Sequence, residues 1–286
     1  MSEAARIAAA FTAACRDELD APKPGNVHAW RASRELTVAA FVRSAEAAAG
    51  PIAEEGARVG HRIAGAIEAT LGAVATNTNL GIVLLCAPLA AAAETMTADL
   101  RAALARVLDD LDRDDAALAF RAIVQASPAG LGRAARHDVF APASATLREA
   151  MAEAANRDRI ARQYVTVFDD VFSLGLPTFA AALPRYGERS WATLAVYLAF
   201  LAAFSDSHIV RKHGTRPAEE VRHTAATFHA RLSAADDPET LLDDLLAWDA
   251  VLKERNINPG TSADLTVATL FAHRLTNVLP SGRNNG

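Results

Sequence analysis

The chain has 286 residues, of which 51% are hydrophobic, enough to bury a large core. Its net charge of −5 creates no positive field for nucleic acid or anionic lipid, so we expect neither as a partner. Cys15 and Cys86 lie in apolar helical sequence, which is typical of a reduced, cytoplasmic protein. We expect no leader peptide and no membrane span, because the longest apolar runs, 80–93 and 191–204, have only 14 residues each.

Apolar residues recur at helical spacing along almost the whole chain. The first helix is predicted over 3–19 and ends before Pro22. Thr37 can cap a second helix, which Gly50-Pro51 should break, and Ser144 can cap a later one. Further helices are predicted over 57–75, 80–95, 97–110, 113–125, 157–173, 176–183, 189–212, 216–232, 237–254 and 262–276.

No segment alternates apolar and polar residues as a strand does, so the sequence predicts an all-α fold. We expect one domain of about a dozen helices over 1–278, with 80–93 and 191–204 buried at its centre and 279–286 as a frayed tail. Residues 126–143 lack a helical pattern, and a stretch of this length is usually a functional lid or a disordered loop.

A dense group of ionisable residues follows the second apolar run, from Asp206 to Gly214. If the helix continues through this group, Asp206 and His213 share one face, and His208 and Lys212 share the next. A carboxylate, two imidazoles and cations at the end of a buried helix suit metal binding, phosphate binding or proton transfer. The alternative is a solvated set of polar groups that complements the negative end of the helix.

The sequence Asn77-Thr78-Asn79-Leu80-Gly81 leads into the first apolar run. Asn77 or Asn79 can cap that helix, and the N–H groups of a helix start also bind anions. Gly81 would let a ligand or another backbone approach closely. A plain cap explains either asparagine alone, whereas two of them around a threonine exceed what capping needs.

The first of two turn motifs is Lys23-Pro24-Gly25-Asn26-Val27-His28. Its Pro-Gly pair predicts a tight turn that brings an ammonium, a carboxamide and an imidazole close together. The lysine suits a phosphate, and an ordinary solvated turn is the alternative.

The second turn motif is Asn258-Pro259-Gly260-Thr261-Ser262-Ala263-Asp264. Thr261 with Asp264 resembles a capping box, which needs no further function. Gly260, Thr261 and Ser262 at a helix start can also gather donors around a phosphate. Four polar motifs of this kind in an apolar chain favour one composite site, and therefore an enzyme.

In order and spacing, the four motifs resemble the triphosphoribosyl-dephospho-coenzyme A synthase family, whose members are all-helical. The resemblance runs from Lys23 to about Leu275. It implies a transferase for which ATP is the ribosyl donor. In that reaction the 2′-hydroxyl of dephospho-coenzyme A attacks C1′ of the ATP ribose, adenine leaves, and the triphosphate stays with the sugar.

The resemblance implies catalytic groups that these motifs can supply. We expect Asp206 and Asp264 to stabilise an oxocarbenium-like state and to accept the hydroxyl proton. The same two carboxylates would hold Mg²⁺ together with the phosphate oxygens. His208 or His213 would protonate the departing adenine.

The resemblance also implies a binding surface for the nucleotide. Lys23, Arg211 and Lys212 are the cations that we expect to contact the triphosphate. The other expected ligand-binding residues are Gly25, Asn26, His28, Asn77, Asn79, Gly81, Gly260, Thr261 and Ser262.

The chain departs from the lyase-associated members in two motifs. Asn26-Val27-His28 stands where the family pattern has an apolar residue and an acidic one, and Thr78-Asn79-Leu80-Gly81 stands where it has Thr-His-Lys-Gly. The chain is similar to a divergent branch found alongside one-carbon cofactor pathways in archaea and methylotrophic bacteria.

The departures widen the choice of acceptor, which is dephospho-coenzyme A or another cofactor precursor. One alternative is a related ribosyl or phosphoribosyl transfer, or another step, in making a methanopterin- or methanofuran-type cofactor. A non-catalytic nucleotide-binding protein is a further alternative. A homodimer is compatible with the sequence.

Overall fold

The computed structural model describes residues 1–31, 37–96, 99–128, 132–134 and 136–278. These residues form fourteen α-helices, a π-helix (η1, Asp170–Gly175), a 3-10 helix (η2, Pro238–Leu241) and no β-strand, which confirms the all-α prediction. The α-helices are α1 (Glu3–Leu19), α2 (Val38–Ile52), α3 (Val59–Val74), α4 (Leu80–Glu94), α5 (Leu100–Asp109), α6 (Arg113–Ala126), α7 (Leu147–Ala154), α8 (Arg159–Thr166), α9 (Leu176–Tyr186), α10 (Arg189–Ala203), α11 (Ser207–His213), α12 (Thr215–Ala234), α13 (Leu242–Glu254) and α14 (Gly260–Val278).

The chain divides into two compact units, each built from separate stretches of sequence. Unit 1 comprises residues 1–14, 39–169 and 271–286, and unit 2 comprises 15–38 and 170–270. That residues 1–278 form a single domain stays a prediction.

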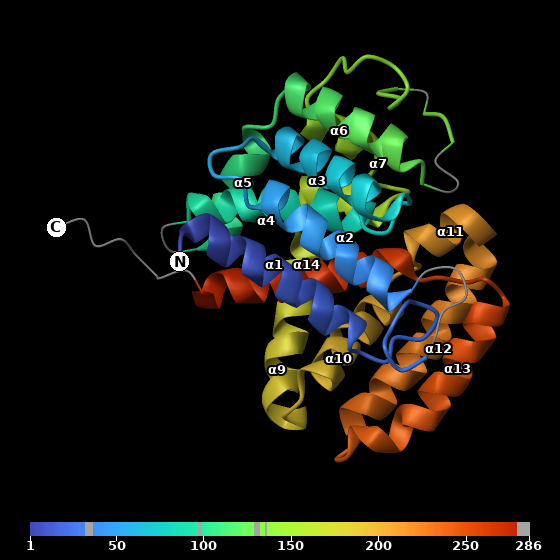
Figure 1. Cartoon of the computed structure of the whole chain (residues 1–286). Helices are drawn as coiled ribbons and strands as arrows, with labels where there is room; N and C mark the ends of the chain where they lie inside the picture. The colour runs from blue at the N-terminus through green and yellow to red at the C-terminus, as the bar shows by residue number, and fades with distance from the viewer. Residues whose placement is uncertain (32–36, 97–98, 129–131, 135, 279–286) are drawn as a thin grey trace. The chain divides into compact units, whose positions relative to one another are not determined.

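Unit 1 is built around α4, whose sequence has no polar face. Almost every residue from Leu80 to Ala93 is buried, because α3, α5 and α8 pack against this helix. On its other side α3 packs against α6, as Figure 1 shows. The prediction of a buried helix over the first apolar run is confirmed.

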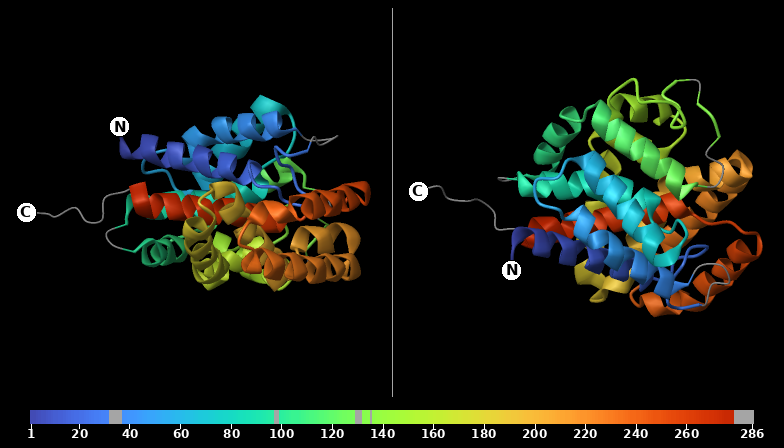
Figure 2. Two further views of the ribbon diagram at one scale, coloured as in Figure 1. Left: turned by 90° about the horizontal axis from the view of Figure 1, so that it is seen from below. Right: turned by 45° about the horizontal axis from the view of Figure 1, so that its top comes forward.

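Unit 2 is built around α10, which is buried from Trp191 to Leu201 and packs against α9 and α12. Helix α13 runs antiparallel to α12, and the orange and red-orange pair is visible in Figure 2. The rings of Phe228 and Trp248 stack between these two helices with centroids 5.0 Å apart. The second apolar run is therefore a buried helix too, as predicted.

The prediction of one helix over 189–212 is wrong. Helix α10 ends at Ala203, Phe204 is extended, and a new helix begins after Asp206, which is its N-cap. The side chain of Asp206 bonds to the backbone of α11, which makes a fresh helix start favourable at this position. Asp206 therefore does not share a helical face with His213, although His208 and Lys212 do lie one turn apart in α11.

The predicted break at Gly50-Pro51 is also wrong, because α2 continues to Ile52. Pro51 lies in the last turn, where its missing N–H removes only one bond and the N–H of Ala53 still reaches the carbonyl of Ala49.

Two further helix boundaries differ from the prediction. Thr146, rather than Ser144, caps α7, because Glu149 completes a capping box with it. The helix predicted over 157–173 ends at Thr166, where Val167 and Phe168 take left-handed φ values of 51° and 53° before η1 begins.

The described part of 126–143 contains no helix beyond Ala126, as predicted, while 129–131, 135 and the predicted tail at 279–286 lie outside the described residues. Within the described residues, no single helix is long and apolar enough to cross a membrane. Two bent helix pairs, within 159–186 and within 189–213, meet that requirement only when both parts are counted together.

Candidate functional site

Three of the four polar motifs lie in unit 2, and two of them contact residues 256–262, which follow α13, include the first residues of α14 and contain most of the third motif. We call these residues the hub segment. The amide of Asn26 donates to Asn258 Oδ1 at 2.8 Å, and Lys212 Nζ lies 3.3 Å from Asn256 Oδ1. Asp206 contacts Ser262 at the other end of the segment. The hub segment therefore joins the motifs 23–28 and 206–214, which are far apart in the sequence.

Asp206 is buried and uses both carboxylate oxygens to hold two helix starts. Its Oδ1 accepts bonds from the N–H groups of His208 at 2.9 Å and Ile209 at 3.2 Å, in α11. Its Oδ2 accepts bonds from the N–H and the hydroxyl of Ser262 in α14, both at 2.8 Å. Burial raises the pKa of Asp206 and outweighs these bonds, which act in the opposite direction.

The predicted capping box of Thr261 with Asp264 is wrong, because α14 already begins at Gly260. The hydroxyl of Thr261 instead lies 2.9 Å from the hydroxyl of Ser207 and accepts a bond from the N–H of His208 at 3.2 Å. A Cβ on Gly260 would come within 2.3 Å of His208 Nδ1, so glycine is required for the imidazole to lie on this backbone.

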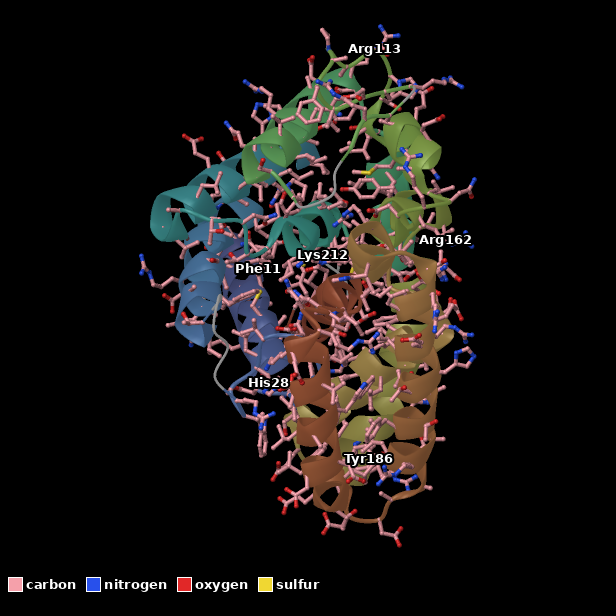
Figure 3. The ribbon with its side chains drawn as sticks, turned by 90° about the vertical axis from the view of Figure 1, so that its right-hand side faces the viewer. Phe11, His28, Arg113, Arg162, Tyr186 and Lys212 are labelled. Atoms are coloured by element: carbon pink, nitrogen blue, oxygen red, sulfur yellow. The ribbon has the colours of Figure 1, made fainter. Side chains whose placement is uncertain are left out.

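A group of positive and titratable side chains ends α11, and we call His208, Arg211, Lys212 and His213 the cationic corner. Arg211 and Lys212 are exposed, and His213 Nε2 lies 2.9 Å from the carbonyl oxygen of Asn256. Burial, followed by the charges of Arg211, Lys212 and His213, lowers the pKa of His208 to about 4. Figure 3 shows Lys212 near the start of α12 and Tyr186 at the far end of that helix.

The ammonium of Lys23 is fully buried and has three partners. It forms an ion pair with Glu18, and it donates to Asn26 Oδ1 at 3.0 Å and to the carbonyl of Val27 at 2.7 Å. Burial lowers the pKa of Lys23, against the effect of Glu18. A lysine has three N–H donors, so none is left for a phosphate, and the predicted phosphate contact of Lys23 does not fit this arrangement.

Gly25 packs its backbone against the hub segment. Its φ is 81°, and a Cβ would lie 2.9 Å from Ile257 O, Leu252 Cδ1 and Pro259 Cδ. Its N–H donates to Asp249 Oδ1 at 2.9 Å. The glycine is therefore needed for close protein packing, which makes no demand for a ligand.

His28, the last residue of the turn, lies beside α13 (Figure 3). Its Nε2 is 3.3 Å from Asp249 Oδ1 and 3.4 Å from Lys253 Nζ. Sequence reasoning missed Asp249, Lys253 and Glu18. A signal was present for Asp249, because Leu245, Asp249 and Leu252 share the buried face of α13, where a carboxylate needs polar partners.

The motif Asn77–Gly81 lies in unit 1, at the start of α4. Asn79 occupies the N-cap position, but the capping bond comes from Asn77, whose Oδ1 accepts from the N–H of Leu80 at 3.1 Å. The amide of Asn79 donates to Thr70 Oγ1 at 3.0 Å and so ties α4 to α3. Gly81 lies in the first turn of α4, as predicted.

Asp264 is half-buried in the first turns of α14. Residues two apart on a helix do not share a face, so Asp264 points away from Ser262, which holds Asp206. After burial and Glu18, the charge of Asp264 contributes to raising the pKa of Cys15. Asp206 and Asp264 therefore lie on different sides of the first turn of α14. The described residues hold no cluster of three metal-ligating side chains.

Comparison with known proteins identifies the family. The sequence profile of the CitG family, ATP:dephospho-CoA triphosphoribosyl transferase, matches residues 4–282. No protein of curated function matches the chain. A crystal structure from Archaeoglobus fulgidus, provisionally described as a triphosphoribosyl-dephospho-coA synthase, has a similar fold, with a TM-score of 0.61 and 21% identity over 82% of this chain and 97% of that chain. Because the profile spans nearly the whole sequence, the chain belongs to the ATP:dephospho-CoA triphosphoribosyl transferase family.

Proposed function

We propose that unit 2 carries the nucleotide site of this ATP-dependent transferase, and that the cationic corner holds the triphosphate of ATP. The observation that carries this proposal is that the exposed cations Arg211 and Lys212 lie beside His208 and His213 in one short helix, α11. Burial lowers the pKa of His208, and the charges of Arg211, Lys212 and His213 lower it further. A group of charges that disfavours one further proton favours an anion such as a triphosphate.

Asp206 acts in this proposal as a positioning residue. Its carboxylate accepts four bonds from described N–H and O–H groups, which fix α11 against the start of α14. Arg211 and Lys212 follow on the same short helix, so the direction of their side chains depends on this anchor.

His208 is the proposed acid for the departing adenine, and it gains its proton only when ATP is bound. A pKa of about 4 leaves the imidazole neutral in the free protein at pH 7. A bound triphosphate would add negative charge next to the ring and raise that pKa. ATP binding should then take up protons, which calorimetry in two buffers of different ionisation enthalpy measures directly.

A divalent metal, such as Mg²⁺, would accompany the triphosphate and neutralise part of its charge. Asp206 does not fit as a ligand, because each of its oxygens already accepts two hydrogen bonds. Asp264 stays the proposed carboxylate for the metal and for the oxocarbenium-like state. No step of the proposed mechanism depends on where the metal lies.

Dephospho-coenzyme A is the proposed acceptor, because the family is defined by that substrate. A one-carbon cofactor precursor is the second candidate, favoured by Asn26 and His28 standing in the turn motif. Both cysteines are buried and neither forms a disulfide with another described residue, which supports a reducing, cytoplasmic compartment.

The test is release of adenine from ATP and a divalent metal, with and without dephospho-coenzyme A. We expect adenine only when the acceptor is present. Arg211→Met should weaken ATP binding about tenfold. Arg185→Met, in α9, should leave it unchanged, because Arg185 donates to the carbonyl of Ala235 at the other end of α12. Equal effects of the two variants would contradict the proposed triphosphate site.

A further inference from the structure

The two ring nitrogens of His28 have different surroundings. Nε2 faces Asp249 and Lys253, at 3.3 Å and 3.4 Å. Nδ1 is also buried, but it has no hydrogen-bond partner among the described residues. A buried polar atom without a partner costs free energy, and such atoms in native proteins often mark a place where a ligand binds or a reaction occurs.

Asp249 determines which nitrogen of His28 carries the proton. Burial would raise the pKa of Asp249, but bonds from His28, Gly25 and Lys253 outweigh burial and lower it. The carboxylate is therefore ionised at neutral pH and can only accept hydrogen bonds. An ionised carboxylate at 3.3 Å favours the tautomer in which Nε2 of His28 donates to Asp249 Oδ1, and this tautomer leaves a lone pair on Nδ1.

Burial, together with two nearby cations, keeps the ring of His28 neutral in the free protein. Burial lowers the pKa of His28, Asp249 acts against burial, and Lys253 and Lys23 lower the pKa further. Asp249 and Lys253 face the ring from α13, and Lys23 belongs to the same turn as His28. A neutral imidazole with one free lone pair is able to take up a proton at pH 7.

The turn that contains His28 and the cationic corner flank the same stretch of the hub segment. Asn26 bonds to Asn258, and His208 bonds to Thr261. Asn258 and Thr261 are three residues apart, so at most about 11 Å separates their Cα atoms. A nucleotide held at the corner and a second substrate beside the turn would therefore meet over this segment.

We propose that His28 is the base that takes the proton of the attacking hydroxyl, with Asp249 as its positioning residue. This inference rests on the proposed function. The hydroxyl oxygen forms the new bond to C1′ of the ribose while the bond from C1′ to the adenine nitrogen breaks. His28 Nδ1 receives the hydroxyl proton, the departing adenine receives a proton from the acid, and Asp249 stabilises the imidazolium until it returns its proton to solvent.

The test compares His28→Gln, Asp249→Asn and Lys253→Met by adenine release from ATP with dephospho-coenzyme A. His28→Gln should lower kcat by about 10²- to 10⁴-fold and leave KM for ATP within about twofold. Asp249→Asn should lower kcat as well, because an amide can donate to Nε2 and reverse the tautomer. His223→Gln, the same change on the exposed face of α12, should leave kcat unchanged.

Lys253→Met supplies a readout that a purely structural role would not give. Removing this cation should raise the pKa of His28, so the acid limb of the rate profile should move to higher pH. Urea unfolding of each variant shows whether it is folded, and ¹⁵N NMR of the histidine-labelled full chain, assigned with His28→Gln, shows which nitrogen is bare.

The outcomes separate the two proposals. A wild-type protein that releases no adenine would overturn the proposed function, and the role of His28 with it. Wild-type turnover with a folded His28→Gln variant within about threefold of it would overturn the role of His28 alone. A protonated Nδ1 in the NMR spectrum would also overturn that role, whereas a bare Nδ1 together with a large loss in kcat would support it.

Discussion

Asp206 and Asp249 are both buried carboxylates that accept several hydrogen bonds, but their pKa values move in opposite directions. Among the described residues, the donors to Asp206 are neutral N–H and O–H groups. Asp249 instead bonds to the ammonium of Lys253, a side chain that is 22% exposed, and to the ring of His28. Burial raises the pKa in both places and prevails only for Asp206.

The difference shows that the number of hydrogen bonds does not decide the charge of a buried carboxylate. A charged partner and a position nearer to solvent let Asp249 stay ionised. Asp206 accepts hydrogen bonds from neutral groups of two helices and so joins those helices. Asp249 pairs with the ammonium of Lys253 and orients the imidazole of His28. The first arrangement is typical of a structural anchor, and the second is typical of a residue that positions a proton-transfer group.

The largest effect on stability should come from removing the anchor. Asp206→Ala leaves the starts of both α11 and α14 without their cap, so we expect a loss of about 2–4 kcal/mol in the free energy of unfolding. Asp99→Ala, which removes an exposed cap from α5 alone, should cost about 1 kcal/mol. Urea denaturation measures both, and equal losses would mean that Asp206 does not join two helices.

An effect of comparable size concerns the turn that contacts Asp249. Gly25→Ala combines left-handed backbone strain with three contacts of 2.9 Å, so we expect a loss of about 2–4 kcal/mol. Gly56 has a similar φ of 71° but nothing within 4 Å, so Gly56→Ala should cost only about 1–2 kcal/mol. The difference in melting temperature between the two variants measures the contribution of close packing at Gly25. Equal melting temperatures would show that packing at Gly25 contributes nothing.

A smaller effect distinguishes the exposed Lys212, which we expect to bind ATP, from the buried Lys23, which we expect to stabilise the fold. Lys212→Met should weaken ATP binding about tenfold, or about 1.4 kcal/mol, and leave unfolding unchanged. Lys23→Met should lower stability, because Glu18 loses its buried partner. Calorimetry and urea denaturation on both variants test this, and a Lys212 variant that binds ATP normally would exclude that residue from the nucleotide site.

The smallest effect is the pH dependence of the two carboxylates. The raised pKa of Asp206 means that its contribution to stability, relative to Asp206→Asn, is full below the ordinary Asp pKa of about 3.9 and is lost as pH rises through the folded pKa. The lowered pKa of Asp249 gives the opposite sign, with its contribution present above about 3.9 and lost as pH falls through the folded pKa. The difference in urea midpoint between the wild type and Asp206→Asn, and that between the wild type and Asp249→Asn, should change with opposite sign between pH 3 and 7. Changes of the same sign would show that the two carboxylates do not differ in this way.

Much of the fold was predictable from apolar periodicity. The two runs without a polar face became α4 and α10 because a helix with no solvated side must be surrounded by other helices. The predicted helix boundaries were wrong where the hydrogen bonds of a single side chain decided where a helix begins. Asp206 started a new helix inside a predicted one, and Thr261 bonded to another helix instead of capping its own.

The candidate site was predictable in its motifs and less so in its partners. The four motifs drew attention to His28 and the cationic corner, but nothing in the turn itself shows that Lys23 pairs with Glu18. Contacts such as His28 with Asp249 join residues more than 200 positions apart, and they depend on how α13 packs, which periodicity does not specify.

The hub segment constrains how relatives of this chain can differ in length. Asn256, Asn258, Thr261 and Ser262 each hold a side-chain or backbone partner in another element, and Ile257 packs on Gly25. An insertion or deletion between Asn256 and Ser262 would shift every later contact by one position. Surface loops usually absorb such changes. Across an alignment of relatives we therefore expect gaps to gather between α6 and α7 and to be rare in the short connection between α13 and α14.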